Sequence, residues 1–257
     1  MEQLKAISRR FRPLLQDGTR PVEFIGRVAA EVPPLLRHGM RRRDFRYYMD
    51  LCGVQALPIV LLICLLMGMV MAVNGQIQLS KLGQEIFVVD AVGFVVLKEL
   101  GPLMVAMVLT GWAGSAFAAE IGTMKLDEQI SALETMGIRP ESFLVFPKLT
   151  AMLISMPVLT VFGNVAGIVG GMLIGVTIMK IPFVAYWTRT IEVLDVTTFL
   201  LGTAKSIPFA ILITLAGCYA NNSQGVGRGA TKAVVASIFL VVVADVLITV
   251  LYSFIGY

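Results

Sequence analysis

Two long runs without a charged residue constrain this chain more than any other feature. Residues 51–80 and 149–179 contain no Asp, Glu, Lys or Arg. Each run is longer than the roughly 20 apolar residues that cross the hydrocarbon core of a bilayer. Charged residues make up 15% of the 257-residue chain, against about 25% in an average soluble domain. The pattern predicts a polytopic membrane protein and disfavours a soluble fold with buried core helices.

Five apolar segments are long enough to span a membrane, at about 51–79, 86–119, 149–179, 197–219 and 233–256. Backbone within lipid must satisfy its own hydrogen bonds, so we expect all five to be helices and the fold class to be all-α. The second segment contains Gly101-Pro102, which predicts a tilted or broken helix. Glycines in the third segment recur every four residues and leave a bare face for close helix packing, at Gly163, Gly167, Gly171 and Gly175.

The distribution of Lys and Arg predicts the orientation of the chain. With the N-terminus in the cytoplasm, sixteen of these residues fall inside, in residues 1–50, 120–148 and 220–232, whereas three fall in the opposite loops. This asymmetry satisfies the positive-inside rule. The basic sequence pI of about 9.0 therefore reflects topology and gives no reason to expect nucleic-acid binding.

Two segments outside the spans have their own helical patterns. Residues 1–50 combine apolar residues at helical spacing with arginines, which predicts amphipathic helices in the headgroup layer on the cytoplasmic side. A disordered basic tail is the alternative interpretation. Residues 180–195 form the longest outer loop, in which Tyr186 and Trp187 predict an interfacial helix on the far side.

The sequence lacks the motifs of common catalytic and nucleotide-binding sites. It contains one histidine, His38, which excludes an HExxH zinc site, and no Gly-Lys dipeptide, which excludes a P-loop. We therefore predict no catalytic residues, no metal ligands and no cofactor bound by this chain, and we do not expect it to be an enzyme.

Charged residues inside the spans are the best candidates for a substrate site. Lys98, Glu99, Lys205 and Asp245 interrupt apolar segments, and each charge costs about 2.5–3.5 kcal/mol at a helix centre on insertion scales. Lys205 lies about 12 Å into its span from outside and Asp245 about 18 Å into its span from inside. In a core about 30 Å thick these depths are similar, so the two side chains could pair, either for function or as a structural ion pair.

Glu99, with Lys98 beside it, is the stronger candidate for a residue that lines a cavity. The two residues are adjacent in a helix, so they do not share a face and cannot simply neutralise each other. They also directly precede the Gly-Pro break, and a broken helix at membrane depth usually lines a cavity.

Residues 124–136 form an acidic amphipathic segment between two spans. An apolar stripe at helical spacing, ended by Gly137, predicts a short helix in a cytoplasmic loop. Residues 120–141 carry five acids and two bases, and anionic headgroups attract basic segments instead. We therefore expect a protein partner with a complementary groove, with a solvated linker helix as the alternative. The candidate docking residues are Leu126, Asp127, Glu128, Ile130, Leu133, Glu134 and Met136.

A membrane protein without its own nucleotide site, but with a cytoplasmic docking helix, suggests the permease half of an ABC transporter. Three stretches, "KELGPLMVA", "GSAFAAEIGTMKLDEQISALETMGI" and "GVGRGATKAVV", closely resemble the MlaE/YrbE permease family, and the resemblance runs from about residue 50 to the end. It implies an MlaE-type fold, with a five-span permease domain over 51–257 preceded by the interfacial region of 1–50.

The same resemblance implies partners and a function. The permease would form a homodimer in a bacterial inner membrane, bind two cytoplasmic ATPase subunits that hold ATP and Mg, and meet a periplasmic lipid-binding MCE-domain protein. Together they would move phospholipids between the inner and outer membranes and so maintain outer-membrane lipid asymmetry. Residues 124–136 would be the coupling helix.

The resemblance also assigns site residues, with departures. Glu99 matches the glutamate of the family's Arg-Glu-Leu-Gly-Pro motif, in which Lys98 replaces the arginine and keeps the charge without the bidentate fork. Leu79 and Leu82 could line the mouth of a lipid cavity for acyl chains. Trp112 stands where the family often has arginine.

Two other functions are compatible with the same spans. An ion- or proton-coupled secondary transporter could use Glu99, Lys205 and Asp245, although the inverted repeats that would support it are not found. A non-transporting membrane scaffold for an ATPase would carry the same charges as purely structural pairs.

Overall fold

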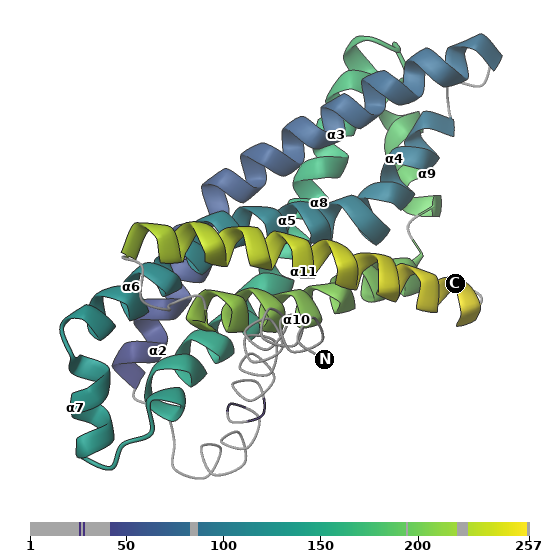
Figure 1. The fold of residues 1–257 in the computed structure, drawn as a ribbon. Helices are drawn as coiled ribbons and strands as arrows, with labels where there is room; N and C mark the ends of the chain where they lie inside the picture. Colours follow the sequence, from purple (N-terminus) through teal and green to yellow (C-terminus); the bar gives the residue numbers. More distant parts are fainter. Residues whose placement is uncertain are drawn as a thin grey trace, which may run out of the picture.

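A computed structural model describes residues 26, 28, 42–82, 87–193, 195–219 and 226–255. Within these ranges every regular element is helical (Figure 1), which confirms the all-α prediction. The interfacial region expected over residues 1–50 lies mostly outside the described residues. Its last part is α2, Arg42–Met49, which leads directly into the first span.

Five helices in the described part of the chain are long and apolar enough to cross a membrane: Arg42–Leu79, Phe87–Leu126, Phe143–Thr177, Val196–Tyr219 and Gly227–Phe254. They confirm the five predicted segments. Four of them extend beyond the predicted segment, in each case at the end predicted to be cytoplasmic. Helical hydrogen bonds continue past the apolar core into charged sequence, so hydropathy marks the lipid-facing part of a helix and not its ends.

The first two spans are built from several helical pieces. Span one, Arg42–Leu79, consists of α2, a π-helical turn η1 (Asp50–Val54) and α3 (Leu57–Leu79), and a short 3-10 turn η2 (Ser80–Leu82) follows it. Span two consists of α4 (Phe87–Val95), η3 (Val96–Leu100), α5 (Gly101–Leu109), η4 (Thr110–Gly114) and α6 (Ser115–Leu126), of which η3 and η4 are π-helical.

The remaining elements complete the bundle. They are α7 (Gln129–Thr135), the π-helical η5 (Glu141–Val145), α8 (Phe146–Thr177), α9 (Phe183–Val193), α10 (Val196–Tyr219) and α11 (Val226–Ile255). In Figure 1, α3 and α8 cross the molecule side by side, while α10 and α11 pack against each other along one flank.

The predicted break at Gly101-Pro102 is a bend produced by π-helix. The π-helical turn η3 ends immediately before Gly101, and Pro102 lies in the first turn of α5, where its missing N–H is tolerated. Figure 1 shows the chain changing direction between α4 and α5. Span two is therefore bent but continuous in the part of the chain described.

Glycines allow the close packing that the sequence predicts in the third span. A Cβ at Gly167 would lie 2.8 Å from Cγ1 of Val96 in η3, and a Cβ at Gly175 would lie 2.6 Å from the ring of Tyr186 in α9. On the neighbouring face, a Cβ at Gly170 would overlap the backbone of Leu65 in α3. Close backbone approach thus places α8 at the centre of the bundle, between α3, η3 and α9.

The outer loop forms the predicted helix, α9, but its two aromatic residues face different surroundings. Trp187 is exposed and stacks on Phe183, with ring centroids 6.4 Å apart, as expected for an interfacial side chain. Tyr186 is instead buried against α8, so of the two aromatic residues Trp187 is the one whose side chain faces outward. Only one face of a helix that packs on the bundle can reach the headgroups.

An ion pair fixes α9 to α4. Arg189 donates from Nε to Asp90 Oδ1 at 2.8 Å and from Nη2 to Asp90 Oδ2 at 2.6 Å. These hydrogen bonds to Asp90 raise the pKa of Arg189 above its ordinary value. The bidentate geometry fixes both the distance and the orientation of the two helices at the end predicted to face outward.

Candidate substrate site and docking surface

The predicted intramembrane charges meet in one cluster around Lys205. Its Nζ donates hydrogen bonds to Glu99 Oε2 at 2.5 Å, to Thr249 Oγ1 at 2.8 Å and to Asp245 Oδ1 at 3.2 Å. The Thr249 hydroxyl in turn donates to Glu99 Oε2 at 3.2 Å. The predicted Lys205–Asp245 pair therefore forms, and Glu99 joins it from another span. We call Glu99, Lys205, Asp245 and Thr249 the charged cluster.

A glycine on α10 explains how Lys205 reaches Glu99. A Cβ at Gly202 would overlap the carbonyl group of Leu97 in η3, so the two backbones touch at that point. Lys205 lies three residues further along α10, on the same face of the helix. The π-helical turn that bends span two carries Glu99 on the side facing α10, and the pair forms where the two helices are closest.

The cluster is buried at its centre and open at its edge. The Lys205 side chain has no exposure, whereas the Glu99 side chain keeps 28% and the Asp245 side chain 15%. One ammonium with two carboxylates leaves the cluster with a formal charge of −1. A carboxylate that remains accessible at membrane depth must face water, a ligand or another protein surface, because contact with lipid tails is costly.

Lys98 lies apart from this cluster, as expected for a neighbour of Glu99 on a helix. Its Nζ sits 5.0 Å from the centroid of the Phe94 ring, a cation–π distance. Lys98 therefore provides a second positive charge beside Glu99 but on another face of span two.

The two leucines predicted for an acyl-chain mouth are not part of the charged cluster. Leu79 packs against an outer apolar group that includes Ala72, Val88 and Val92. Leu82 belongs to η2, and its side chain lies outside the described residues.

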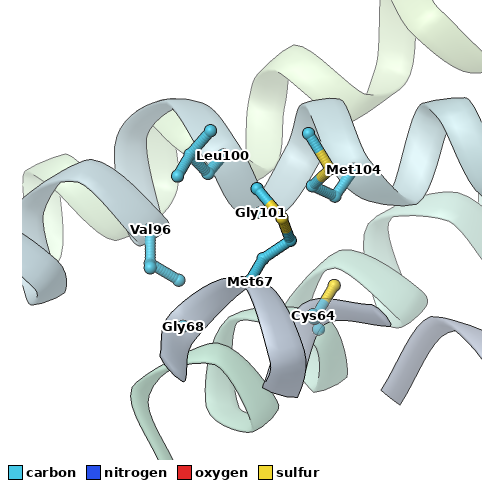
Figure 2. Close-up of a pocket in the computed structure, with 8 residues that line it drawn as sticks. Cys64, Met67, Gly68, Val96, Leu100, Gly101 and Met104 are labelled. Carbon is cyan, nitrogen blue, oxygen red and sulfur yellow. The ribbon is translucent and has the colours of Figure 1, made fainter. Parts of the chain in front are cut away.

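A small apolar pocket lies beside the bend of span two (Figure 2). Met67 of α3 and Met104 of α5 both line it, and Gly101 forms part of its wall. None of the predicted charged residues lines it. Asn164 of α8 lies directly against Gly101, and its buried amide has no hydrogen-bond partner among the described residues.

The docking segment is not the single helix predicted over 124–136. Helix α6 continues to Leu126, Asp127 and Glu128 form a turn, and α7 runs over Gln129–Thr135. Glu128 has φ 56°, in the left-handed region, so the chain turns sharply and α7 points away from α6 (Figure 1). Helical spacing alone could not reveal this break, because Glu128 is a residue type that favours a helix, although it takes the left-handed conformation here.

The end of α7 follows the prediction. Gly137 has φ +74°, Gly137 N donates to Glu134 O, and Ile138 N donates to Leu133 O, which is a Schellman stop. The apolar stripe divides in two: Leu126 and Met136 are two-thirds exposed, whereas Ile130 packs against the core. Asp127, Glu128 and Glu134 are exposed. The acidic surface with two exposed apolar side chains at its ends is available to a partner.

Comparison with known proteins agrees with this architecture. Residues 45–251 match the family described as Permease MlaE. The chain belongs to the MlaE permease family. It is 34% identical over 205 residues to a probable ABC transporter permease protein of Rickettsia conorii, a match that covers 78% of this chain and 79% of the relative.

Two further relatives connect the MlaE family to transport. The intermembrane phospholipid transport system permease protein MlaE of Haemophilus influenzae is 34% identical over 207 residues, covering 78% of this chain and 79% of that protein. A probable ABC transporter permease protein of Synechocystis is 27% identical over 216 residues, covering 82% of each chain. This MlaE-family chain is therefore an ABC transporter permease.

Two features of this MlaE-family site were missed by the sequence reasoning. Thr249 joins the charged cluster, and its position four residues after Asp245, on the same helix face, was the available signal. Lys148 was counted as a loop charge, yet its side chain has no exposure and lies beside Glu120. The signal there was its place at the junction between a charged loop and an apolar span.

Proposed function

We propose that this chain is the membrane-spanning subunit of an ATP-driven phospholipid transporter. Two copies would form the pathway, with the N-terminus in the cytoplasm of a bacterium and α7 facing a cytoplasmic ATPase that holds ATP and Mg. A periplasmic MCE-domain protein would exchange lipid with the outer end. The transporter would sit in the inner membrane and serve the lipid asymmetry of the outer membrane.

The observation that carries this proposal is the accessible Glu99 carboxylate in the charged cluster. Glu99 and Asp245 share one ammonium, so one negative charge is available to a ligand. A phospholipid headgroup with an amine and a phosphate would place its amine near Glu99 and its phosphate near Lys98. The opposite charges on neighbouring faces of span two suit such a zwitterion.

The proposal of a second copy of this chain rests on the exposure of the charged cluster and of α11. The apolar window of α11 is 11% buried, the smallest share of the five spans, and α11 also carries Asp245 and Thr249. A second chain against α11 would shield the cluster from lipid tails while leaving a cavity for a headgroup. The docking segment favours the proposal of an ATPase partner, because its exposed acids and its exposed Leu126 and Met136 lie together outside the bundle.

Reconstituted complexes test the proposal. Proteoliposomes that contain this chain with its ATPase and MCE-domain partners should transfer labelled phospholipid when ATP is added, and purified complex should retain phospholipid. Glu99→Gln removes the charge and keeps the shape, and Glu99→Lys reverses the charge. Both should assemble normally and transfer lipid poorly. Transfer driven by a proton gradient without ATP would instead favour a secondary transporter, and wild-type transfer by both variants would remove Glu99 from the site.

A further inference from the structure

A second buried cluster lies at the end of the bundle that carries α7. Tyr48 of α2 donates from its hydroxyl to Glu120 Oε1 at 2.6 Å, and Lys148 Nζ lies 3.3 Å from Glu120 Oε2. The Lys148 ammonium also lies 5.0 Å from the ring centroid of Tyr48 and 5.8 Å from that of Phe117. We call Tyr48, Glu120 and Lys148 the loop-base cluster.

The loop-base cluster joins the two ends of the docking loop. Glu120 lies on α6, which leads into α7, and Lys148 lies in the first turn of α8, which follows it. The ion pair therefore closes the loop that presents α7 to the cytoplasm. Tyr48 adds a third element, because α2 continues through η1 into the first span. A force applied to α7 reaches the spans through these three attachments.

Stability alone gives a poor account of this arrangement. The Lys148 side chain has no exposure, yet its Nζ makes no hydrogen bond to a described residue despite the ion-pair distance to Glu120. A buried ammonium with so few partners is costly, and an apolar pair of similar volume is usually as stable or more so. In some proteins buried polar or ionic groups instead serve to fix one relative position of the elements that carry them.

We propose that Tyr48, Glu120 and Lys148 are positioning residues that transmit movement of α7 to the spans. This inference rests on the proposed function, since it assumes that a cytoplasmic ATPase moves α7. The Glu120–Lys148 pair makes α6 and α8 move together, and the Tyr48 hydrogen bond makes α2 follow. Without the pair, α7 can move without moving α6 and α8 together. ATP binding and hydrolysis then no longer change the position of the charged cluster.

The test uses Glu120→Gln combined with Lys148→Met in the full complex. This double variant removes both charges together, so no buried charge is left unpaired and the fold is retained. We expect normal assembly, a melting temperature near that of the wild type, and about a tenfold fall in lipid transferred per ATP hydrolysed. Tyr48→Phe should lower the same ratio by about threefold. The matched control is Asp90→Asn with Arg189→Gln, which removes an ion pair at the opposite end and should leave the ratio unchanged.

Hydrogen exchange provides a readout that does not depend on the substrate. In wild-type complex, a nonhydrolysable ATP analogue should change exchange both in residues 126–136 and in α8. In the double variant the change should persist in 126–136 and disappear from α8. Persistence in both segments, with an unchanged ratio of lipid to ATP, overturns the inference. If wild-type complex hydrolyses ATP but moves no phospholipid, the proposed function fails, and the exchange data alone still decide this inference.

Discussion

The charged cluster and the loop-base cluster each bury a lysine completely, but they satisfy it differently. Lys205 Nζ has three oxygen partners within 3.2 Å, two of them on carboxylates. Lys148 Nζ has one carboxylate oxygen at 3.3 Å and two aromatic rings. The first cluster has a surplus negative charge and an accessible edge, whereas the second is neutral and closed around its lysine.

This difference separates a site that can exchange partners from one that cannot. A ligand amine can take one carboxylate of the charged cluster, because the other carboxylate and Thr249 remain to hold Lys205. In the loop-base cluster, loss of Glu120 would leave the ammonium without an anionic partner among the described residues. The same residue type therefore serves binding in one place and positioning in the other, and the number of its partners distinguishes the two roles.

Helix α8 connects the two clusters physically. It begins beside Lys148 and, at Gly167, contacts Val96 of η3, the element that carries Glu99. A shift at the cytoplasmic end can thus reach η3 through one continuous helix.

Lys205→Met should be the most destabilising single change. It removes the one ammonium between Glu99 and Asp245 and leaves two carboxylates at membrane depth, at a cost of about 3–5 kcal/mol. The measurement is the free energy of unfolding in detergent. Lys205→Met with Glu99→Gln and Asp245→Asn removes all three charges and should recover most of that loss. A single variant as stable as the wild type would mean that water, and not Lys205, balances the carboxylates.

The loop-base cluster should respond asymmetrically to loss of either partner. Glu120→Gln leaves the fully buried Lys148 ammonium unpaired and should cost about 3 kcal/mol. Lys148→Met leaves a carboxylate whose side chain is 34% exposed and still accepts the Tyr48 hydrogen bond, so the cost should be about 1 kcal/mol or less. Chemical denaturation of both variants checks the order. Equal losses would show that Lys148 is hydrated in solution.

Much of the fold could be predicted from the sequence, because lipid imposes simple rules. Long apolar segments, two of them free of charged residues, located all five spans, since a lipid-facing surface must be apolar. The pairing of Lys205 with Asp245 could be predicted because both residues lie at a similar depth in the membrane. The rise per residue of a helix gives that depth. Glu99 was identified as a cavity residue from its Gly-Pro neighbours, and the structure brings it to the same cluster.

Other features depend on packing that spacing does not encode. The turn at Asp127–Glu128 interrupts a pattern that fits a continuous helix, and only its left-handed backbone reveals it. By sequence Lys148 is assigned to a charged loop. Its burial depends on α2 and α6, which cover it and are distant from it in the sequence. Leu79, predicted for the mouth of a lipid cavity, packs in an apolar group with residues of α4 and α8, and that role stays a prediction. The turn depends on local backbone geometry and the burial of Lys148 on the elements that cover it, and helical spacing contains neither.

Gly167→Ala should disturb the connection between the two clusters. The new Cβ would lie 2.8 Å from Val96 Cγ1, and a β-branched side chain in a helix has few alternative rotamers. We expect a loss of about 1–3 kcal/mol from overpacking and weaker lipid transfer, because η3 must shift and carry Glu99 with it. Gly93→Ala is the control, since nothing lies within 4 Å of its added Cβ. Equal effects of both substitutions would contradict the connection.

Trp112→Phe should have the smallest effect of the series. Trp112 donates from Nε1 to the Leu51 carbonyl of η1 at 3.2 Å and carries no charge, so it belongs to neither cluster. Loss of this partly exposed hydrogen bond should cost about 0.5–1.5 kcal/mol in unfolding free energy. Trp112→Arg introduces the residue that the family resemblance led us to expect, and its guanidinium can donate to the same carbonyl, so it should be more stable than Trp112→Phe. Neither variant should change the lipid transferred per ATP, because the bond joins span one to span two without touching Glu99 or Lys148. If Trp112→Phe reduced transfer as strongly as Glu99→Gln, the substrate path would extend along span two to η4, and the division between a binding cluster and a positioning cluster would be too simple.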